Sequence, residues 1–131
     1  MRSTGAVAVG WIRVGVGLLL AAAPGMFVRR FVDDEASGSL ILFTRTVGVR
    51  DLALGLGTLA AERSGSTTDL ERWVRAGLVS DSLDLVGGLA GRGLIGRRGT
   101  AIATATVLPV IACDLLGLRQ LAATADQPRP D

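Results

Sequence analysis

The sequence predicts an all-α integral membrane protein, a four-helix bundle whose helices run up-down-up-down. Hydrophobic residues make up 49% of the 131 residues, whereas charged residues make up only 20%. The apolar residues gather in four segments of about 20 residues, the length that an α-helix needs to cross the hydrocarbon core of a bilayer. The chain also contains 18 glycines. Glycine weakens a helix in water but lets transmembrane helices approach closely, so this content also favours a membrane bundle.

Short polar connections separate the four apolar segments. The segments cover residues 5–27, 39–61, 69–90 and 100–118. The connections cover residues 29–38, 62–67 and 91–99. In TDLE at positions 68–71, the spacing of Thr and Glu is that of a capping box, which predicts that the third helix begins there. An even number of spans places both termini on the same side of the membrane.

The segment boundaries also predict the domain organisation. We expect a single four-helix transmembrane domain over residues 1–121 and a short polar tail over residues 122–131. The tail is rich in polar residues and proline, which is typical of a chain end that packs against nothing.

The composition argues against several classes of function. There is no His and no Lys, so familiar hydrolase triads and Schiff-base chemistry lack their key groups. Cys113 is the only cysteine, which excludes an intramolecular disulfide and a cysteine-rich metal site. The net charge is only +2, and no basic face suits nucleic acid. We therefore expect no enzyme, no cofactor, no metal and no nucleic-acid partner.

Beyond the first turn of the third segment, eight charged residues lie inside the four apolar segments, and their formal charges sum to zero. They are Arg13, Arg45, Arg50, Asp51, Arg75, Asp81, Asp84 and Asp114. On an insertion scale, each Arg or Asp at the centre of a membrane helix costs about 2.5 to 3.5 kcal/mol. We therefore expect these side chains to pair with one another in the interior of the bundle, as an intramembrane polar network.

Depth along the helices predicts which charges meet. With a rise of about 1.5 Å per residue and alternating helix directions, the charges fall at comparable levels in certain combinations. The predicted contacts are Arg50 with Asp81, Arg45 with Asp84, and Arg13 or Arg75 with both Asp114 and Asp51. Neighbouring residues differ by about 100° around a helix, so Arg50 and Asp51 are expected to face different neighbours rather than each other.

Small residues share a helix face with the charges at helical spacing. These residues are Gly10 and Gly17 beside Arg13, Gly48 and Gly55 beside Asp51, and Gly77 and Gly88 beside Asp81 and Asp84. Because small side chains let helix backbones approach each other, the pattern predicts that the charges lie at helix contacts.

The run RTVGVRDLALG at positions 45–55, followed by DSLD at positions 81–84, resembles a group of known proteins. These are small uncharacterised four-span bacterial membrane proteins near the DoxX-like group, and the likeness covers most of residues 5–120. The resemblance implies a multi-pass four-helix bundle in the bacterial inner membrane. It implies no established activity and transfers no catalytic residue.

Three functions remain open from the sequence. The first is an accessory or scaffold subunit whose paired charges fix the helices, with the lipid bilayer and a second copy or another membrane protein as partners. The second is a component of proton, ion or small-solute transport that uses the carboxylates of Asp51, Asp81, Asp84 and Asp114. The third is a soluble helical bundle. The first is preferred because nothing in the chain specifies a transported species.

Overall fold

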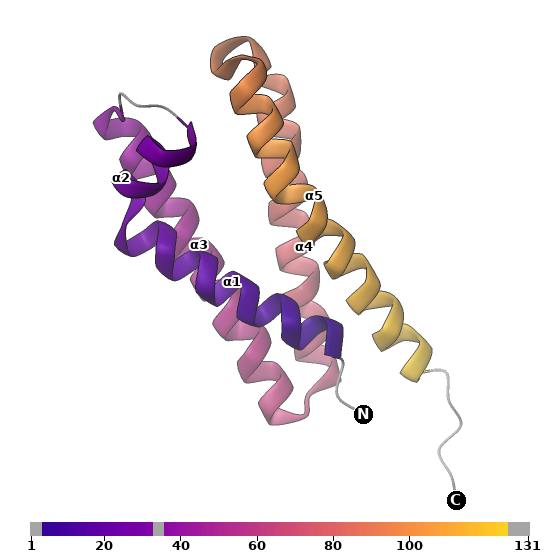
Figure 1. Cartoon of the computed structure of the whole chain (residues 1–131). Helices are drawn as coiled ribbons and strands as arrows, with labels where there is room; N and C mark the ends of the chain where they lie inside the picture. Colours follow the sequence, from indigo (N-terminus) through magenta and orange to yellow (C-terminus); the bar gives the residue numbers. More distant parts are fainter. Residues whose placement is uncertain (1–3, 33–35, 126–131) are drawn as a thin grey trace, which may run out of the picture.

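The computed structural model describes residues 4–32 and 36–125, and every element in them is a helix (Figure 1). The elements are α1 (Thr4–Ala22), α2 (Pro24–Phe27), the π-helix η1 (Val28–Val32), α3 (Gly38–Ser64), α4 (Thr67–Ala90) and α5 (Arg92–Ala125). The prediction of an all-α chain is confirmed. The four predicted segments correspond to the four long helices α1, α3, α4 and α5.

The first segment is shorter than expected because its helix stops before a proline. α1 ends at Ala22, and Ala23 has non-helical dihedral angles (φ −130°, ψ 48°). Pro24 then occupies the first position of α2, where its missing N–H costs nothing. Inside a continuous helix the same proline would have removed a hydrogen bond and clashed with a carbonyl of the preceding turn.

The turn between α3 and α4 corrects the predicted start of the third segment. Gly65 ends α3 with a left-handed conformation (φ 72°), which glycine adopts without steric cost. Ser66 caps α4, because its Oγ accepts a hydrogen bond from the Asp69 backbone N–H at 3.2 Å and donates one to Asp69 Oδ2 at 2.8 Å. The cap therefore lies two residues before the predicted cap at Thr68, and the helix begins at Thr67.

The predicted third connection is mostly helical. α5 starts at Arg92, directly after Gly91, and leaves helical geometry only at Gly96 (φ 68°, ψ 178°), a conformation that is open essentially to glycine alone. The helix then continues to Ala125, past the predicted domain end at position 121. Residues 126–131 of the predicted tail and residues 33–35 of the predicted first connection lie outside the described residues.

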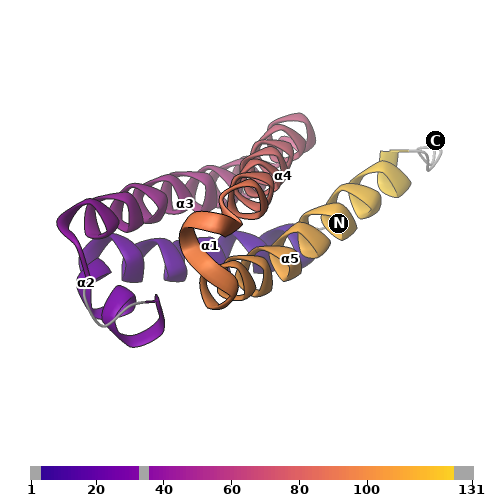
Figure 2. The ribbon, with the colours of Figure 1, turned by 90° about the horizontal axis from the view of Figure 1, so that it is seen from above.

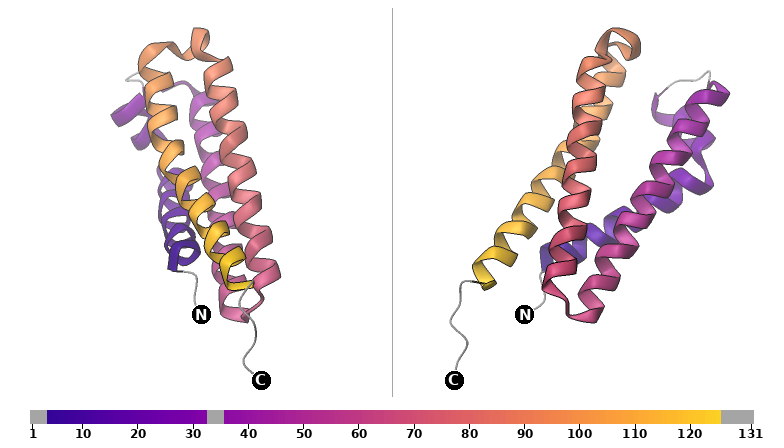
Figure 3. Two further views of the ribbon diagram at one scale, coloured as in Figure 1. Left: turned by 90° about the vertical axis from the view of Figure 1, so that its right-hand side faces the viewer. Right: turned by 180° about the vertical axis from the view of Figure 1, so that it is seen from behind.

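The long helices associate in two pairs. α1 packs mainly on α3, and the two lie side by side when seen from above (Figure 2). α4 packs mainly on α5. The two pairs meet near the α3–α4 turn and diverge toward their other ends (Figure 3). A small hydrophobic core, consisting of Ala6, Ala61, Leu70, Val74 and Leu121, lies where they meet.

Glycines allow the backbones of α1 and α3 to touch. A Cβ atom at Gly17 would lie 2.5 Å from Leu52 N, and one at Gly48 would lie 2.5 Å from Ala21 N. No side chain has room at such distances. The prediction that small residues mark helix contacts is therefore confirmed for this pair.

Two of the long helices have the length and composition of membrane spans. They are Thr4–Ala22, with a mean hydropathy of 1.8, and Arg92–Thr124, with a mean hydropathy of 2.0. The same criteria do not select α3 or α4, both of which contain several charged residues. Of the four spans expected from the sequence, hydropathy thus supports two.

Apolar side chains remain exposed on all four long helices. Prominent examples are Leu18, Leu42, Phe43, Leu83, Val86 and Leu116. Only 11% of the most apolar window of α5 is buried inside the fold. Large exposed apolar patches on proteins are generally sites of contact with a membrane, a ligand or another protein.

Candidate functional site

One guanidinium group links all four long helices. Arg13 of α1 is buried, and its Nη2 donates hydrogen bonds to Asp81 Oδ2 of α4 at 2.6 Å and to Asp114 Oδ2 of α5 at 2.7 Å. Its Nη1 donates to Asp81 Oδ1 at 3.5 Å and lies 3.8 Å from Asp51 Oδ1 of α3. Because charge-assisted bonds of this kind are the stronger ones in proteins, Arg13 is the centre of the site.

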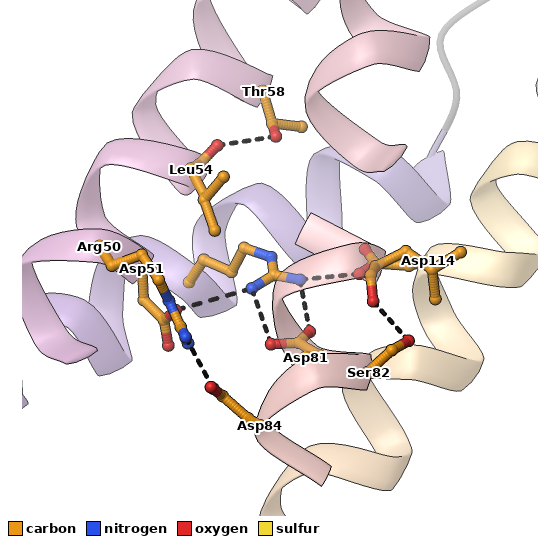
Figure 4. Close-up of polar contacts among 10 residues, drawn as sticks. Arg50, Asp51, Leu54, Thr58, Asp81, Ser82, Asp84 and Asp114 are labelled. Carbon is orange, nitrogen blue, oxygen red and sulfur yellow. Dashed lines mark hydrogen bonds and ion pairs between the residues drawn. The ribbon is translucent and has the colours of Figure 1, made fainter. Parts of the chain in front are cut away.

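A second arginine extends this cluster along α4. Arg50 donates from Nε and Nη2 to Asp51 Oδ1, at 3.1 Å and 2.8 Å. Its Nη1 forms an ion pair with Asp84 Oδ2 at 2.7 Å. Figure 4 shows Asp51 beside Arg50, with Asp84 on the neighbouring helix. Asp51 is therefore shared by both arginines, which makes the whole cluster continuous.

We refer to these residues together as the ion-pair network. Its members are Arg13, Arg50, Asp51, Asp81, Asp84 and Asp114. Two positive and four negative formal charges give the network a net charge of −2. Asp114 is only 1% exposed, and its Oδ1 has no hydrogen-bond partner among the described residues. A net negative charge in the interior is unfavourable unless it is compensated, so the network has capacity for further positive charge.

A glycine makes room for the central guanidinium. A Cβ atom at Gly77 of α4 would lie 2.6 Å from Arg13 Nη2. Gly77 stands one helical turn before Asp81, on the face that the sequence marked as small. The sequence identified this face of small residues. It did not show that the space left by the missing side chain of Gly77 is filled by Arg13 of α1.

The predicted contacts of Arg13 with Asp114 and Asp51 are present. The predicted pair of Arg50 with Asp81 is wrong, because Arg50 contacts Asp84 and Asp81 accepts from Arg13. Residue 50 lies 14 positions before the end of α3 and residue 81 lies 14 positions after the start of α4, so their levels do match. Rotation about the helix axes, which depth ignores, determines the partner.

Two of the eight predicted residues lie outside the network. Arg45 donates from Nε to the carbonyl of Ala21 at 3.2 Å, so its predicted pair with Asp84 is wrong. Arg75 pairs with Glu71 one turn away, at 2.5 Å on the exposed face of α4. The sequence left open whether Arg13 or Arg75 contacts Asp114. In the structure it is Arg13 that does so.

The expectation for Arg50 and Asp51 is confirmed in part. The two do reach different helices, because Asp51 lies beside Arg13 of α1 and Arg50 pairs with Asp84 of α4. They were not expected to contact each other, yet Arg50 also donates to the carboxylate of Asp51. Although neighbouring residues differ by about 100° around the helix, the arginine side chain is long enough to reach the carboxylate of the next residue.

A cleft of about 830 Å³ lies between the α1–α3 pair and the α4–α5 pair. Its walls are mostly apolar and include Val16, Phe43, Val47, Leu83, Ile102 and Val110. The network closes its inner end, where Arg13, Arg50, Asp51, Asp81 and Asp84 all line it. A volume of about 300 to 1,000 Å³, with apolar walls and a few convergent polar groups, is typical of small-molecule sites.

The chemistry available in the cleft is electrostatic. Among residues 4–32 and 36–125, no group of three or more His, Cys, Asp or Glu side chains is arranged to hold a metal ion. Cys113 lines the cleft as a free, half-buried thiol. The charged groups there are suited to recognising an opposite charge in an apolar setting.

Known proteins add no further constraint on this site. Comparison of the chain with family models, curated proteins and solved structures finds no match. The likeness of positions 45–55 and 81–84 to DoxX-like proteins therefore stays a prediction, and the geometry of the ion-pair network and its cleft is the basis for a functional assignment.

Proposed function

We propose that this chain is a multi-pass integral membrane protein that binds a small amphipathic molecule in the cleft, as a component of solute binding or transport. The observation that carries the proposal is the junction of an apolar cleft with a charged inner end. An amphipathic molecule would place its apolar body against the walls and its polar group at the network.

Exposed apolar surface supports the membrane setting. The core helix of a soluble domain is mostly buried, whereas only 11% of the most apolar window of α5 is buried inside the fold. The charges that lower the hydropathy of α3 are partly compensated, because Arg50 and Asp51 are both paired. Intramembrane charges typically face the interior and pair in this way. On this proposal all four long helices cross the bilayer, up-down-up-down, with both termini on one side.

A second function, the accessory subunit, has its own supporting observation. Gly87, Gly88 and Gly91 line the α4 side of the cleft, and a Cβ atom at Gly87 would meet nothing within 4 Å. Faces of small residues are where membrane helices approach each other. In this alternative a helix of another membrane protein occupies the cleft in place of a small molecule.

Equilibrium dialysis of the detergent-purified protein against three phenyl-substituted probes tests small-molecule binding. Tetraphenylphosphonium, tetraphenylborate and neutral triphenylphosphine oxide present similar aromatic bodies with different charges. We expect saturable binding of at least one probe, and loss of that binding in Gly87→Phe, which fills the cleft.

The matched control is Val86→Phe, because Val86 is adjacent, exposed and outside the cleft lining. It should bind like the wild-type protein. If no probe binds saturably, or if both phenylalanine variants lose binding equally, the small-molecule proposal is wrong and the accessory subunit takes its place.

A further inference from the structure

The charge balance of the network specifies what kind of molecule the cleft takes. We infer that the cleft selects an organic cation, a molecule with an apolar body and one positively charged group that binds beside Asp84 and Asp51. This inference rests on the proposed small-molecule function and narrows it to one ligand class.

The charged groups facing the cleft are unequal in number. Three carboxylates and two guanidinium groups line it, which leaves a net charge of −1 at its inner end. Asp114, directly behind Arg13, adds a further negative charge that is fully buried. This excess of negative charge would repel an anion and attract a cation.

The unpartnered oxygen of Asp114 is an independent sign of the same excess. Arg13 Nη2 serves both Asp81 and Asp114, and Asp114 Oδ1 is left without a hydrogen bond. Buried polar atoms in folded proteins almost always have a partner. The arginine donors in place do not satisfy all the carboxylate oxygens around them.

Accessibility places the ligand at the outer part of the network. The side chains of Arg50 and Asp84 are 30% and 33% exposed, whereas those of Arg13, Asp81 and Asp114 are nearly inaccessible. A cationic group entering from the cleft therefore reaches Asp84 first, with Asp51 next to it. Arg50 is the cation already paired with both of these carboxylates, so it competes with the ligand.

The apolar walls strengthen this selection. A charge–charge attraction is several-fold larger near low-dielectric surroundings than in water. The cleft walls contribute Phe43, Leu83 and Val47 close to the network along α3 and α4. An aromatic or alkyl body packs there while its charge lies at the inner end. A small inorganic cation would lack the apolar contact.

The test compares binding of the three phenyl-substituted probes to the wild-type protein and to two variants with opposite expectations. Wild-type protein should bind tetraphenylphosphonium and should not bind tetraphenylborate saturably. Asp84→Asn should weaken binding of tetraphenylphosphonium about tenfold or more, because it removes the most accessible carboxylate. Arg50→Gln should tighten binding, because it removes the competing cation.

The control is Glu71→Gln, which makes the same change of charge on the exposed face of α4, away from the cleft. It should leave binding unchanged. Because damage to the fold would weaken binding in every variant, the opposite signs expected for Asp84→Asn and Arg50→Gln separate recognition from misfolding.

Three outcomes overturn the inference. Equal saturable binding of cation, anion and neutral probe, lost in Gly87→Phe, would keep the cleft as a binding site but remove its selectivity for cations. Equal weakening by Asp84→Asn and Arg50→Gln would make both side chains structural. If no probe binds at all, the proposed function fails with the inference.

Discussion

The guanidinium Nη2 of Arg13 lies 2.7 Å from Asp114 Oδ2, and this hydrogen bond joins the first long helix to the last across 101 positions of the chain. The same nitrogen also holds Asp81 of α4. The two helix pairs, which diverge on either side of the cleft, are therefore tied together at their junction by one buried side chain.

Removal of this side chain should destabilise the whole fold. Arg13→Gln leaves Asp81 and Asp114 buried without a positive partner, and breaking a buried pair in this way typically costs about 3 to 5 kcal/mol. Unfolding in detergent, followed by circular dichroism, measures the loss. Arg75→Gln is the control, because its exposed pair with Glu71 should contribute less than about 1 kcal/mol. Equal effects of the two changes would contradict a central role for Arg13.

Gly77→Ala should displace the Arg13 guanidinium without removing it. The added methyl group would lie 2.6 Å from Nη2, and overpacking of this kind costs about 1 to 3 kcal/mol. Gly87→Ala, on the same helix with nothing within 4 Å, should be neutral or stabilising by up to about 1 kcal/mol. Thermal melting of the two variants gives the comparison, and a Gly77→Ala protein as stable as Gly87→Ala would disprove the crowding.

Gly17→Ala should separate α1 from α3. Its methyl group would meet backbone atoms of Leu52 at 2.5 Å, and backbone cannot rotate away as a side chain can. We expect a loss of at least about 1 to 3 kcal/mol. Gly15→Ala on the exposed face of α1 meets nothing within 4 Å and serves as the reference in the same melting experiment. A tolerated alanine at position 17 would show that the helices pack less closely than described.

Charge reversal tests the partner of Arg50. Arg50→Asp alone places a third carboxylate beside Asp51 and Asp84 and should lower the abundance of folded protein. Adding Asp84→Arg restores one opposite pair at 2.7 Å spacing, so the double variant should recover part of the loss. The combination Arg50→Asp with Asp81→Arg should not recover it. If the combination with Asp81→Arg recovered folded protein and the combination with Asp84→Arg did not, Arg50 would pair with Asp81, as depth alone predicts.

Alkaline carbonate extraction of cells that express the chain tests the membrane setting. The chain should stay in the membrane pellet, because the apolar faces of α1 and α5 are largely uncovered in the fold. Tags at either terminus should show the same protease accessibility in sealed vesicles. A chain recovered in the supernatant would contradict the proposal.

Periodicity and segment length were sufficient to predict the helical class and the positions of the long helices. Their ends depended on local chemistry that the apolar pattern does not contain. Pro24 divides the first segment, and Ser66 supplies the cap that the pattern placed at Thr68. The glycine faces predicted the α1–α3 contact because the absence of a side chain is visible in the sequence.

The pairing of charges was only partly predictable. Depth follows from residue number, but a partner also depends on rotation about two helix axes and on how far a side chain reaches. Arg13 became the centre because Gly77 leaves space beside it, a relation between residues on different helices. The cleft could not be predicted, because it forms where two helix pairs diverge and no short stretch of sequence encodes that divergence.

The long separation between Arg13 and its partners has a consequence for biogenesis. At ribosomal rates of about 5 to 20 residues per second, roughly 5 to 20 s pass between synthesis of Arg13 and synthesis of Asp114, 101 positions later. During that interval the first helix carries a positive charge whose carboxylates do not all yet exist. Asp51 and Asp81 are synthesised before Asp114, so Arg13 can find a carboxylate before the last helix is complete. A chain that ends before Asp114 lacks the hydrogen bond that joins α1 to α5, so the polar contacts between the four long helices are complete only once the last helix has been made.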